Sequence, residues 1–195
     1  MIAIINYGLG NLRSIQKVFE SFGQEVIITS TIEEIEKSKA IILPGVGAFG
    51  AAMDELEKLS LTTILKRKIQ SVPTLGICLG MQLLFGSSDE DPTIKGLNLI
   101  QGKVKELTPI NNVRIPHTGW NELLSIKEPF FSGFAYFNHS FYCEPGQKES
   151  IISYVLHGTK IPVIIKQNNI LGVQFHPEKS QTTGREIIRY FLSQM

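Results

Sequence analysis

One segment, residues 72–85, constrains the fold more than any other. It starts as a short apolar run after Pro73, which is typical of a buried strand, and it ends in apolar residues at helical spacing. Between the two, Cys78 has Gly76 and Gly80 two residues away on either side. This is the sulfur counterpart of the Gly-x-Ser-x-Gly elbow, in which a sharp strand-to-helix turn holds a nucleophile in a strained backbone conformation. Glycine at both places keeps the turn from being crowded.

The elbow leaves two interpretations of Cys78. At a helix N-terminus, the helix dipole and the unpaired N–H groups favour a reactive thiolate. A buried and inert thiol is the other possibility, because most free cysteines in proteins are of that kind. Residues elsewhere in the chain have to separate the two.

The first 86 residues alternate between strand and helix patterns. Such alternation predicts a doubly wound parallel sheet, whose active site lies beyond the carboxyl ends of its strands. The expected strands are 1–6, 25–29, 40–43 and the start of the elbow, and the expected helices are 12–22, 31–37 and 53–70.

After residue 85 the pattern changes to short strands broken by glycine and proline. We expect an antiparallel extension here, with a hairpin turn at Asn168–Asn169 and a closing helix over 184–192. The expected strands are 97–107, 113–120, 121–127, 136–143, 151–156, 162–167 and 170–175. The whole chain of 195 residues is then one α/β domain, 1–195, with a mostly parallel doubly wound sheet flanked by helices.

Composition excludes several classes of function. The net charge of +1 gives no electrostatic footprint for nucleic acid, and no segment has the pattern of a signal peptide or a membrane span. The two cysteines lie far apart and match no metal-ligand spacing. We therefore expect a cytoplasmic protein with no metal, no cofactor, no disulfide and no nucleic-acid or membrane partner.

The loop from Gly45 to Gly50 reads Gly-Val-Gly-Ala-Phe-Gly, which fits the dinucleotide-binding pattern literally. Three features argue against that interpretation: the loop follows the third expected strand, no acidic residue lies about 20 positions on, and Pro44 alters the turn. The alternative use of such a loop is to point backbone N–H groups at an oxyanion. A nucleotide-binding module using Gly45–Gly50 remains the second hypothesis, from a different class.

A cysteine nucleophile needs a base and a group that orients the base. Of the four histidines, His176 alone ends an apolar strand and has a carboxylate, Glu178, at fixed short spacing. If the chain stays extended, both side chains point the same way, so Glu178 can hold one ring nitrogen while the other faces the sulfur. The sequence thus predicts a Cys78–His176–Glu178 triad for acyl transfer on an amide or ester. Its oxyanion hole would use the N–H groups of Leu79 and of the loop at Val46.

Several segments together resemble the class I glutamine amidotransferases and, among them, the glutaminase subunits of imidazole glycerol phosphate synthase. The two signature segments are Gly-Ile-Cys-Leu-Gly-Met-Gln (76–82) and Val-Gln-Phe-His-Pro-Glu-Lys-Ser (173–180). The match is narrowed by Asn-Tyr-Gly-Leu-Gly-Asn-Leu (6–12), Leu-Pro-Gly-Val-Gly-Ala-Phe (43–49), Pro-His-Thr-Gly-Trp-Asn (116–121) and Tyr-Phe-Asn-His-Ser-Phe (136–141).

This resemblance implies hydrolysis of glutamine through a cysteine thioester and delivery of ammonia to a partner (β/α)₈-barrel cyclase subunit in histidine biosynthesis. It implies that Gly47, Gln82 and the segment His139, Ser140 and Phe141 hold the substrate. It also places Asn11 and Trp120 near the partner and the ammonia exit.

Two residues depart from the pattern of that family. Thr118 stands where methionine or another apolar residue is more usual, and Asn138 stands where valine is more usual. The departures leave open a paralogous glutaminase subunit that serves a cyclase-like synthase in surface-polysaccharide sugar biosynthesis. An inactive regulatory relative is a further alternative, against which the complete triad argues.

Overall fold

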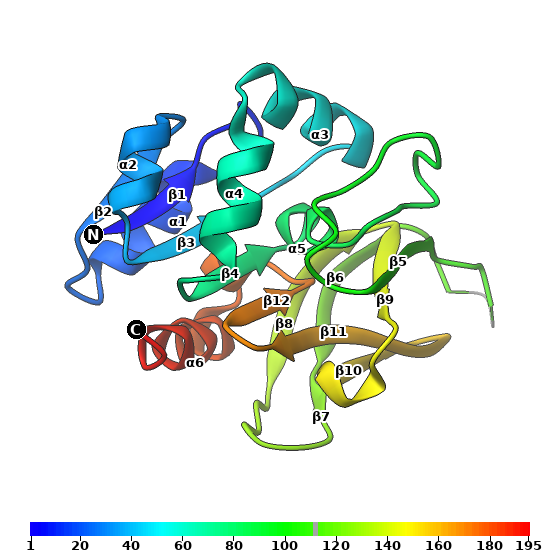
Figure 1. Cartoon of the computed structure of the whole chain (residues 1–195). Helices are drawn as coiled ribbons and strands as arrows, with labels where there is room; N and C mark the ends of the chain where they lie inside the picture. Colours follow the sequence, from blue (N-terminus) through cyan, green and yellow to red (C-terminus); the bar gives the residue numbers. More distant parts are fainter. Residues whose placement is uncertain (111–112) are drawn as a thin grey trace.

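The computed structural model describes residues 1–110 and 113–195, and its helices and strands alternate along the first part of the chain (Figure 1). The strands are β1 (Ile2–Ile5), β2 (Val26–Thr29), β3 (Ala40–Leu43), β4 (Thr74–Ile77), β5 (Gly102–Glu106), β6 (His117–Glu122), β7 (Leu124–Ser125), β8 (Phe134–His139), β9 (Phe141–Pro145), β10 (Ile151–His157), β11 (Thr159–Gln167) and β12 (Ile170–Val173). The helices are α1 (Leu12–Glu20), α2 (Ile32–Lys37), α3 (Phe49–Lys58), α4 (Leu61–Ile69), α5 (Leu79–Leu83) and α6 (Gln181–Leu192), with 3₁₀ turns η1 (Lys148–Ser150) and η2 (Pro177–Lys179).

The central sheet has eight strands in the order β2-β1-β3-β4-β12-β11-β10-β7. Neighbours from β2 through β12 run parallel, whereas β11, β10 and β7 continue the sheet in antiparallel fashion. Two further two-stranded sheets, β5–β9 and β6–β8, lie beside it. The predicted mostly parallel α/β sheet with an antiparallel extension is therefore confirmed.

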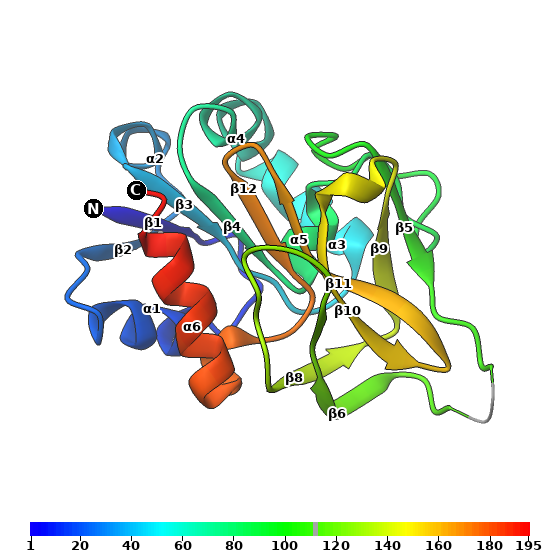
Figure 2. The same cartoon turned by 90° about the horizontal axis from the view of Figure 1, so that it is seen from below.

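Alternating side chains of the parallel strands fill two cores, one on each face of the sheet. In β1, Ile2 and Ile4 pack in the core that α1 and α6 cover, whereas Ala3 and Ile5 pack in the core under α2, α3 and α4. Figures 1 and 2 show these two sets of helices on opposite faces. Burial on both faces explains why β1 reads as a continuous apolar run rather than as an alternating one.

The helix predicted over 53–70 is wrong in one respect, because the structure has two helices in that region. The break falls at Leu59 and Ser60, and Ser60 takes up left-handed backbone angles with φ 57°. The change of direction buries both Leu56, before the break, and Leu61, after it. In a single straight helix these two residues, five positions apart, would not share a face.

The strand predicted over 136–143 is likewise divided, at Ser140. The first part, β8, pairs with β6, and the second part, β9, pairs with β5. The chain has to pass from one small sheet to the other, so the ladder is interrupted there. The predicted hairpin is confirmed, since residues 168–169 join β11 to β12. The closing helix begins at Gln181, earlier than predicted.

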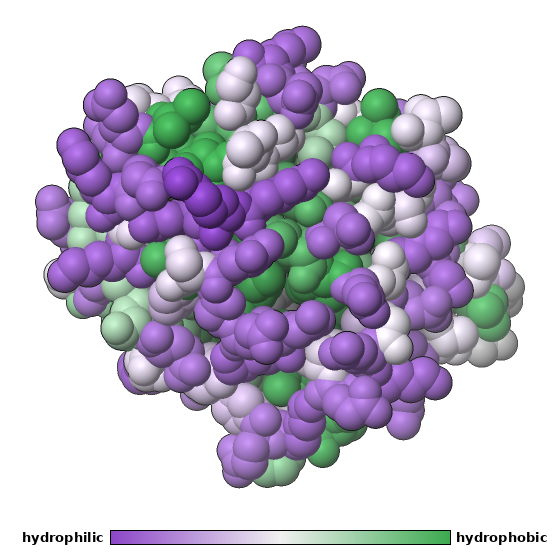
Figure 3. All heavy atoms as spheres, in the orientation of Figure 1, coloured by the Kyte–Doolittle hydropathy of each residue, from purple (hydrophilic) through white to green (hydrophobic). Residues whose placement is uncertain are grey.

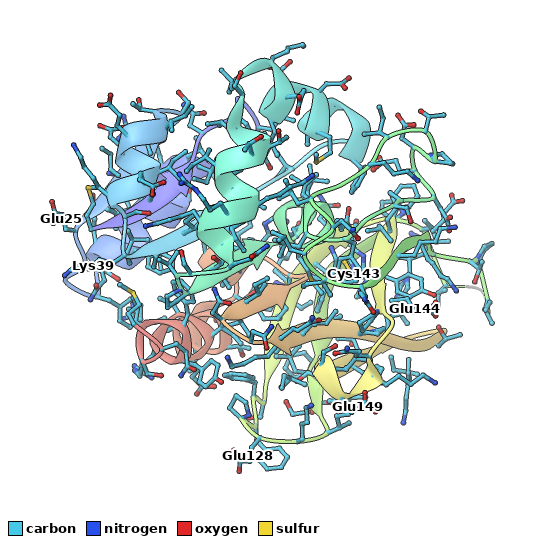
Figure 4. The ribbon with its side chains drawn as sticks, in the orientation of Figure 1. Glu25, Lys39, Glu128, Cys143, Glu144 and Glu149 are labelled. Carbon is cyan, nitrogen blue, oxygen red and sulfur yellow. The ribbon has the colours of Figure 1, made fainter. Side chains whose placement is uncertain are left out.

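Side chains on the outside of the molecule are mostly hydrophilic. Figure 3 shows this on one face, where apolar side chains come to the surface near the centre and in separate smaller patches toward the edge. Along β9 the alternation is visible in Figure 4, where Cys143 lies inside and Glu144 lies toward the surface. Both cysteines are free, and no helix in the described part of the chain is long and apolar enough to span a membrane.

Candidate active site

Cys78 forms a sharp turn between β4 and α5, as the elbow pattern predicts. Its backbone angles are φ 51° and ψ −109°, a region that side-chain-bearing residues seldom occupy. The turn is closely packed: a Cβ at Gly80 would overlap the carbonyl oxygen of Leu43, and a Cβ at Gly76 would lie 2.9 Å from the Cα of Met81. Glycine is required at both places by this crowding.

His176 follows β12 and is tied to β8 by its backbone. Its N–H donates to the carbonyl of Tyr136 at 3.0 Å, and its own carbonyl accepts from the hydroxyl of Ser180 at 2.7 Å. The same hydroxyl oxygen accepts the N–H of Tyr136 at 2.9 Å. The chain past His176 does not stay extended, because residues 177–179 form the turn η2. The carboxylate still reaches the ring: Glu178 Oε1 lies 3.1 Å from His176 Nδ1.

The charges of this region favour a protonated imidazole. Burial by itself lowers the pKa of His176, but hydrogen bonds to Cys78 and Glu178 and the negative charge of both groups raise it to about 9. The carboxylate of Glu178 is buried, and its Oε2 has no hydrogen-bond partner among the described residues. An imidazolium beside it therefore compensates a charge that would otherwise be costly to bury.

A cavity of about 260 Å³ opens over the sulfur. It brings together nine of the residues that the sequence singled out: Val46, Gly47, Cys78, Leu79, Gln82, His139, Ser140, Phe141 and His176. Glu178 lies behind the His176 ring rather than in the cavity wall. As the first residue of α5, Leu79 has a backbone N–H with no partner inside the helix, so this donor is available beside the nucleophile.

Gln82 and Gln174 form a buried amide pair beneath the cavity. Gln82 Nε2 donates to the Phe141 carbonyl at 3.2 Å and to Gln174 Oε1 at 3.4 Å. Gln174 Nε2 in turn lies 3.6 Å from Cys78 Sγ. Both N–H groups of Gln82 are thus engaged, which leaves its carbonyl oxygen as the group it can offer a ligand. Sequence reasoning did not single out Gln174; its only signal is a polar residue in an otherwise apolar strand end.

Glu90 also lines the cavity, and the sequence analysis missed it. Its Oε2 accepts the N–H of Phe49, the first residue of α3, at 2.8 Å. Nothing in the acidic loop 86–92 distinguishes Glu90 from its neighbours, so only the fold reveals the contact. The contact also bears on nucleotide binding: the helix N-terminus that would hold a phosphate is already occupied by a carboxylate. Asp91 beside Gly50 adds a second negative group, and the nucleotide-binding hypothesis is not favoured.

Asn11 and Trp120 lie outside the cavity. Asn11 is exposed at the start of α1, where its Oδ1 accepts the hydroxyl of Ser14 at 2.9 Å. Trp120 is 48% exposed on the outer face of β6 and contacts Tyr136 on the paired strand, with ring centroids 6.1 Å apart. Lys179 lies over the same Tyr136 ring at 5.5 Å. This outer face therefore carries an aromatic pair with Lys179 beside it, and neither Trp120 nor Tyr136 lines the substrate cavity.

Comparison with protein families agrees with the fold and the cavity. Residues 3–195 match the family described as glutamine amidotransferase class-I. The chain belongs to this family, whose members are glutamine-hydrolysing enzymes.

Within the class, the chain is similar over its length to subunits of one synthase. The imidazole glycerol phosphate synthase subunit HisH of Staphylococcus epidermidis is 45% identical, with 98% of this chain and 96% of that protein covered. The subunit HisH of Methanothermobacter thermautotrophicus is 42% identical, with 98% of both chains covered. The chain is therefore a member of the HisH family.

Solved structures with low sequence identity show the same fold. A crystal structure of a glutamine amidotransferase superposes with a TM-score of 0.81 at 20% identity, covering 99% of this chain and 98% of that one. A chain in the structure of PurLQS from Thermotoga maritima superposes with a TM-score of 0.71 at 16% identity, covering 98% of this chain and 97% of that one. The arrangement of sheet and helices is therefore common to proteins whose sequences have diverged widely.

Proposed function

We propose that residues 1–195 act as the glutaminase unit of an imidazole glycerol phosphate synthase, with Cys78, His176 and Glu178 as the catalytic triad. The observation that carries the assignment is the grouping of three side chains at one cavity. Cys78, held at a left-handed elbow, and His176 line the same substrate-sized cavity, and His176 Nδ1 lies 3.1 Å from the buried carboxylate of Glu178. HisH relatives at 42–45% identity favour this synthase over the surface-polysaccharide alternative.

The reaction has two halves. In the first, the Cys78 thiolate attacks the carbon of the glutamine side-chain amide, the protonated His176 gives its proton to the departing nitrogen, and ammonia leaves a thioester behind. In the second, a water molecule loses a proton to His176, attacks the thioester carbon and expels the Cys78 sulfur with glutamate as product. Glu178 holds the ring in one orientation and compensates its positive charge in both halves.

The oxygen of the reacting carbonyl becomes negative in both halves. The Leu79 N–H at the start of α5, together with an N–H from the loop at Val46 and Gly47, supplies the donors that such an oxyanion requires. Losing one donor of this kind typically costs about 10²–10³ in rate.

The other end of glutamine carries an ammonium and a carboxylate. The free carbonyl oxygen of Gln82 and the carboxylate of Glu90 both line the cavity and are acceptors, which suits the ammonium group. The segment from His139 to Phe141 also lines the cavity, and we assign its backbone to the carboxylate end of glutamine. Groups that bind both an ammonium and a carboxylate would make the cavity selective for a free amino acid.

Because its relatives are subunits of a synthase, we also assign this chain a partner, a (β/α)₈-barrel cyclase that consumes the ammonia in the cytoplasm. The outer face of β6 and β8, with exposed Trp120 beside Tyr136 and Lys179, is the docking surface. Asn11 belongs to the same partner contact.

The test is a glutaminase assay with a matched pair of cysteine variants. Cys78→Ala should reduce glutamine hydrolysis to the background rate while the protein melts at a normal temperature. Cys143→Ala removes the other free thiol, which is buried in β9, and should leave most of the activity. Turnover by Cys78→Ala comparable to wild type would rule the proposal out, and a rate that does not rise when the cyclase is added would rule out the coupling.

A further inference from the structure

Three of the four histidines take no part in the triad, and they form one cluster in which His117 and His139 are buried and His157 is half-buried. His117 on β6 and His139 on β8 are paired residues whose Nδ1 and Nε2 atoms lie 3.0 Å apart. The His117 ring is stacked between Phe137, at 4.6 Å, and His157, at 4.1 Å. The cluster adjoins the substrate cavity, because His139 lines its wall.

The partners of the cluster fix where each proton lies. A carbonyl oxygen can only accept, so His139 Nδ1, 2.8 Å from the Phe141 carbonyl, carries a hydrogen. In the neutral ring, His139 Nε2 is then an acceptor, and His117 Nδ1 must donate to it. His117 Nε2 is in turn an acceptor for Asn121 Nδ2, at 3.1 Å. One set of neutral tautomers satisfies the whole chain.

The chain continues on the far side of the Phe141 carbonyl. The same oxygen accepts from Gln82 Nε2, whose second hydrogen goes to Gln174, and Gln174 donates toward Cys78 Sγ. A continuous line of hydrogen bonds therefore runs from strand β6, under the cavity, to the nucleophile.

The acid–base state of the two rings agrees with this pattern. Burial lowers the pKa of His139 to about 3 and the pKa of His117 to about 4. The positive charges that other histidines can carry act in the same direction, since His157 faces both rings and His176 faces His139. Both rings are therefore neutral near pH 7, which is the state that the donor and acceptor sequence requires.

We infer that His117 is a positioning residue for glutamine binding, acting through His139 on the Phe141 carbonyl and thereby on Gln82. The inference rests on the proposed function, and it goes beyond the triad by assigning a role to a side chain that touches no substrate. Without the hydrogen of His117, either His139 Nε2 is left without a donor or His139 changes tautomer. In the second case the Phe141 carbonyl loses one of its two donors, and Gln82 loses the fixed acceptor that orients it.

Two substitutions separate this role from simple packing. His117→Phe keeps an aromatic ring between Phe137 and His157 but removes the donor. His117→Asn loses the ring but keeps an N–H close to the position of Nδ1. A positioning role predicts that KM for glutamine rises about tenfold in His117→Phe, with kcat changed less than threefold, and that His117→Asn stays within about threefold of wild type. A packing role predicts instead that KM for glutamine rises in His117→Asn and changes little in His117→Phe.

A double-mutant cycle adds a second readout. His139→Phe breaks the same line of hydrogen bonds and also alters the cavity wall, so adding His117→Phe to it should raise KM no further than His139→Phe alone. The alkylation rate of Cys78 by iodoacetamide, followed by mass spectrometry, should stay within about twofold of wild type, because this reagent does not use the amino-acid subsite. His157→Phe is the matched control, since its ring stacks on His117 but its Nε2 donates outside the line, to the Arg114 carbonyl at 2.9 Å.

The outcomes are distinct. A wild-type protein without glutaminase activity, alone or with the cyclase, would overturn the proposed function. An active wild type with an unchanged KM in His117→Phe, or with additive effects in the double variant, would overturn the inference alone. Should His117→Phe fail to fold, as judged by thermal melting, His139→Phe carries the same test: an unchanged KM for glutamine in that variant would contradict the inference.

Discussion

Two buried histidine sites adjoin one cavity, through His176 and through His139, and have opposite acid–base behaviour. His176 pairs with the carboxylate of Glu178, and its pKa is raised to about 9 despite burial. His117 and His139 pair with each other, a carbonyl and an amide, and burial lowers their pKa values to about 4 and about 3. Burial lowers the pKa of all three rings, and only the negatively charged partners of His176 reverse the direction. One site is built to hold and release a proton, and the other to keep its hydrogens in place.

Removing the carboxylate of Glu178 should make the pKa of His176 fall like those of His117 and His139, and it should have the largest effect on activity. In Glu178→Gln the His176 ring loses the charge that stabilises its protonated form, and its pKa should fall toward or below 6.5. We expect kcat to drop by about 10²–10⁴-fold, the usual worth of a positioned acid–base group. Steady-state kinetics and ring NMR titration measure the two effects. Glu144→Gln, on the exposed side of β9, is the control, and equal losses in both variants would contradict the assignment.

Low pH should destabilise the fold through the His117–His139 pair. His117 and His139 bind protons in the unfolded chain below about pH 6.5 but resist them in the fold down to about pH 3–4, so stability rises with pH in this window. It is lost as the pH falls, by about 1.4 kcal/mol per pH unit for each ring. Melting between pH 7 and pH 4.5 measures this slope. It should flatten in the double variant His117→Asn with His139→Asn and persist in His157→Phe.

High pH should weaken the stabilisation that comes from the pairing of His176 with Glu178, which is the opposite pH dependence. The folded pKa of His176 is raised, so the stabilisation from its pairing with Glu178 is fully present below about pH 6.5 and is lost as the pH rises to about 9. The difference in melting temperature between wild type and Glu178→Gln should therefore be largest near pH 6 and shrink toward pH 9.5. A difference that grows over this range would mean that the imidazole is neutral in the fold.

The smallest expected effect concerns the backbone that carries His176. Ser180→Ala removes the hydroxyl that serves both the His176 carbonyl and the Tyr136 N–H. The carbonyl keeps the Lys179 N–H at 3.0 Å, whereas the half-buried Tyr136 N–H loses its acceptor. We expect a loss of about 1–3 kcal/mol in unfolding free energy. Ser193→Ala, near the exposed end of α6, should change it by less than about 0.5 kcal/mol. Denaturant unfolding of both variants gives the comparison.

Sequence patterns were sufficient for features that depend on neighbours along the chain. The parallel strands, the elbow at Cys78 and the short spacing of His176 and Glu178 all belong to this kind. The breaks at Ser60 and Ser140 were missed because they arise where the chain must change its packing partner. Both serines lie in segments whose local pattern is that of an unbroken helix or strand.

The polar interior could not have been predicted in the same way. Gln174 and Gln82 meet across 92 residues, and Glu90 reaches Phe49 across 41. Such contacts depend on the register of strands that are distant in the sequence. His117 and His139 illustrate the point: each is ordinary in its own segment, and only the pairing of β6 with β8 makes them one unit.

The left-handed backbone at residue 78 has a consequence for how this protein would evolve in the laboratory. Glycine adopts such angles freely, whereas a residue with a side chain does not. A library at this position, selected for heat resistance with no demand for turnover, should accordingly enrich glycine and discard the thiol. Stability and catalysis therefore favour different residues at position 78. In a variant selected for thermal stability, this position should be sequenced first.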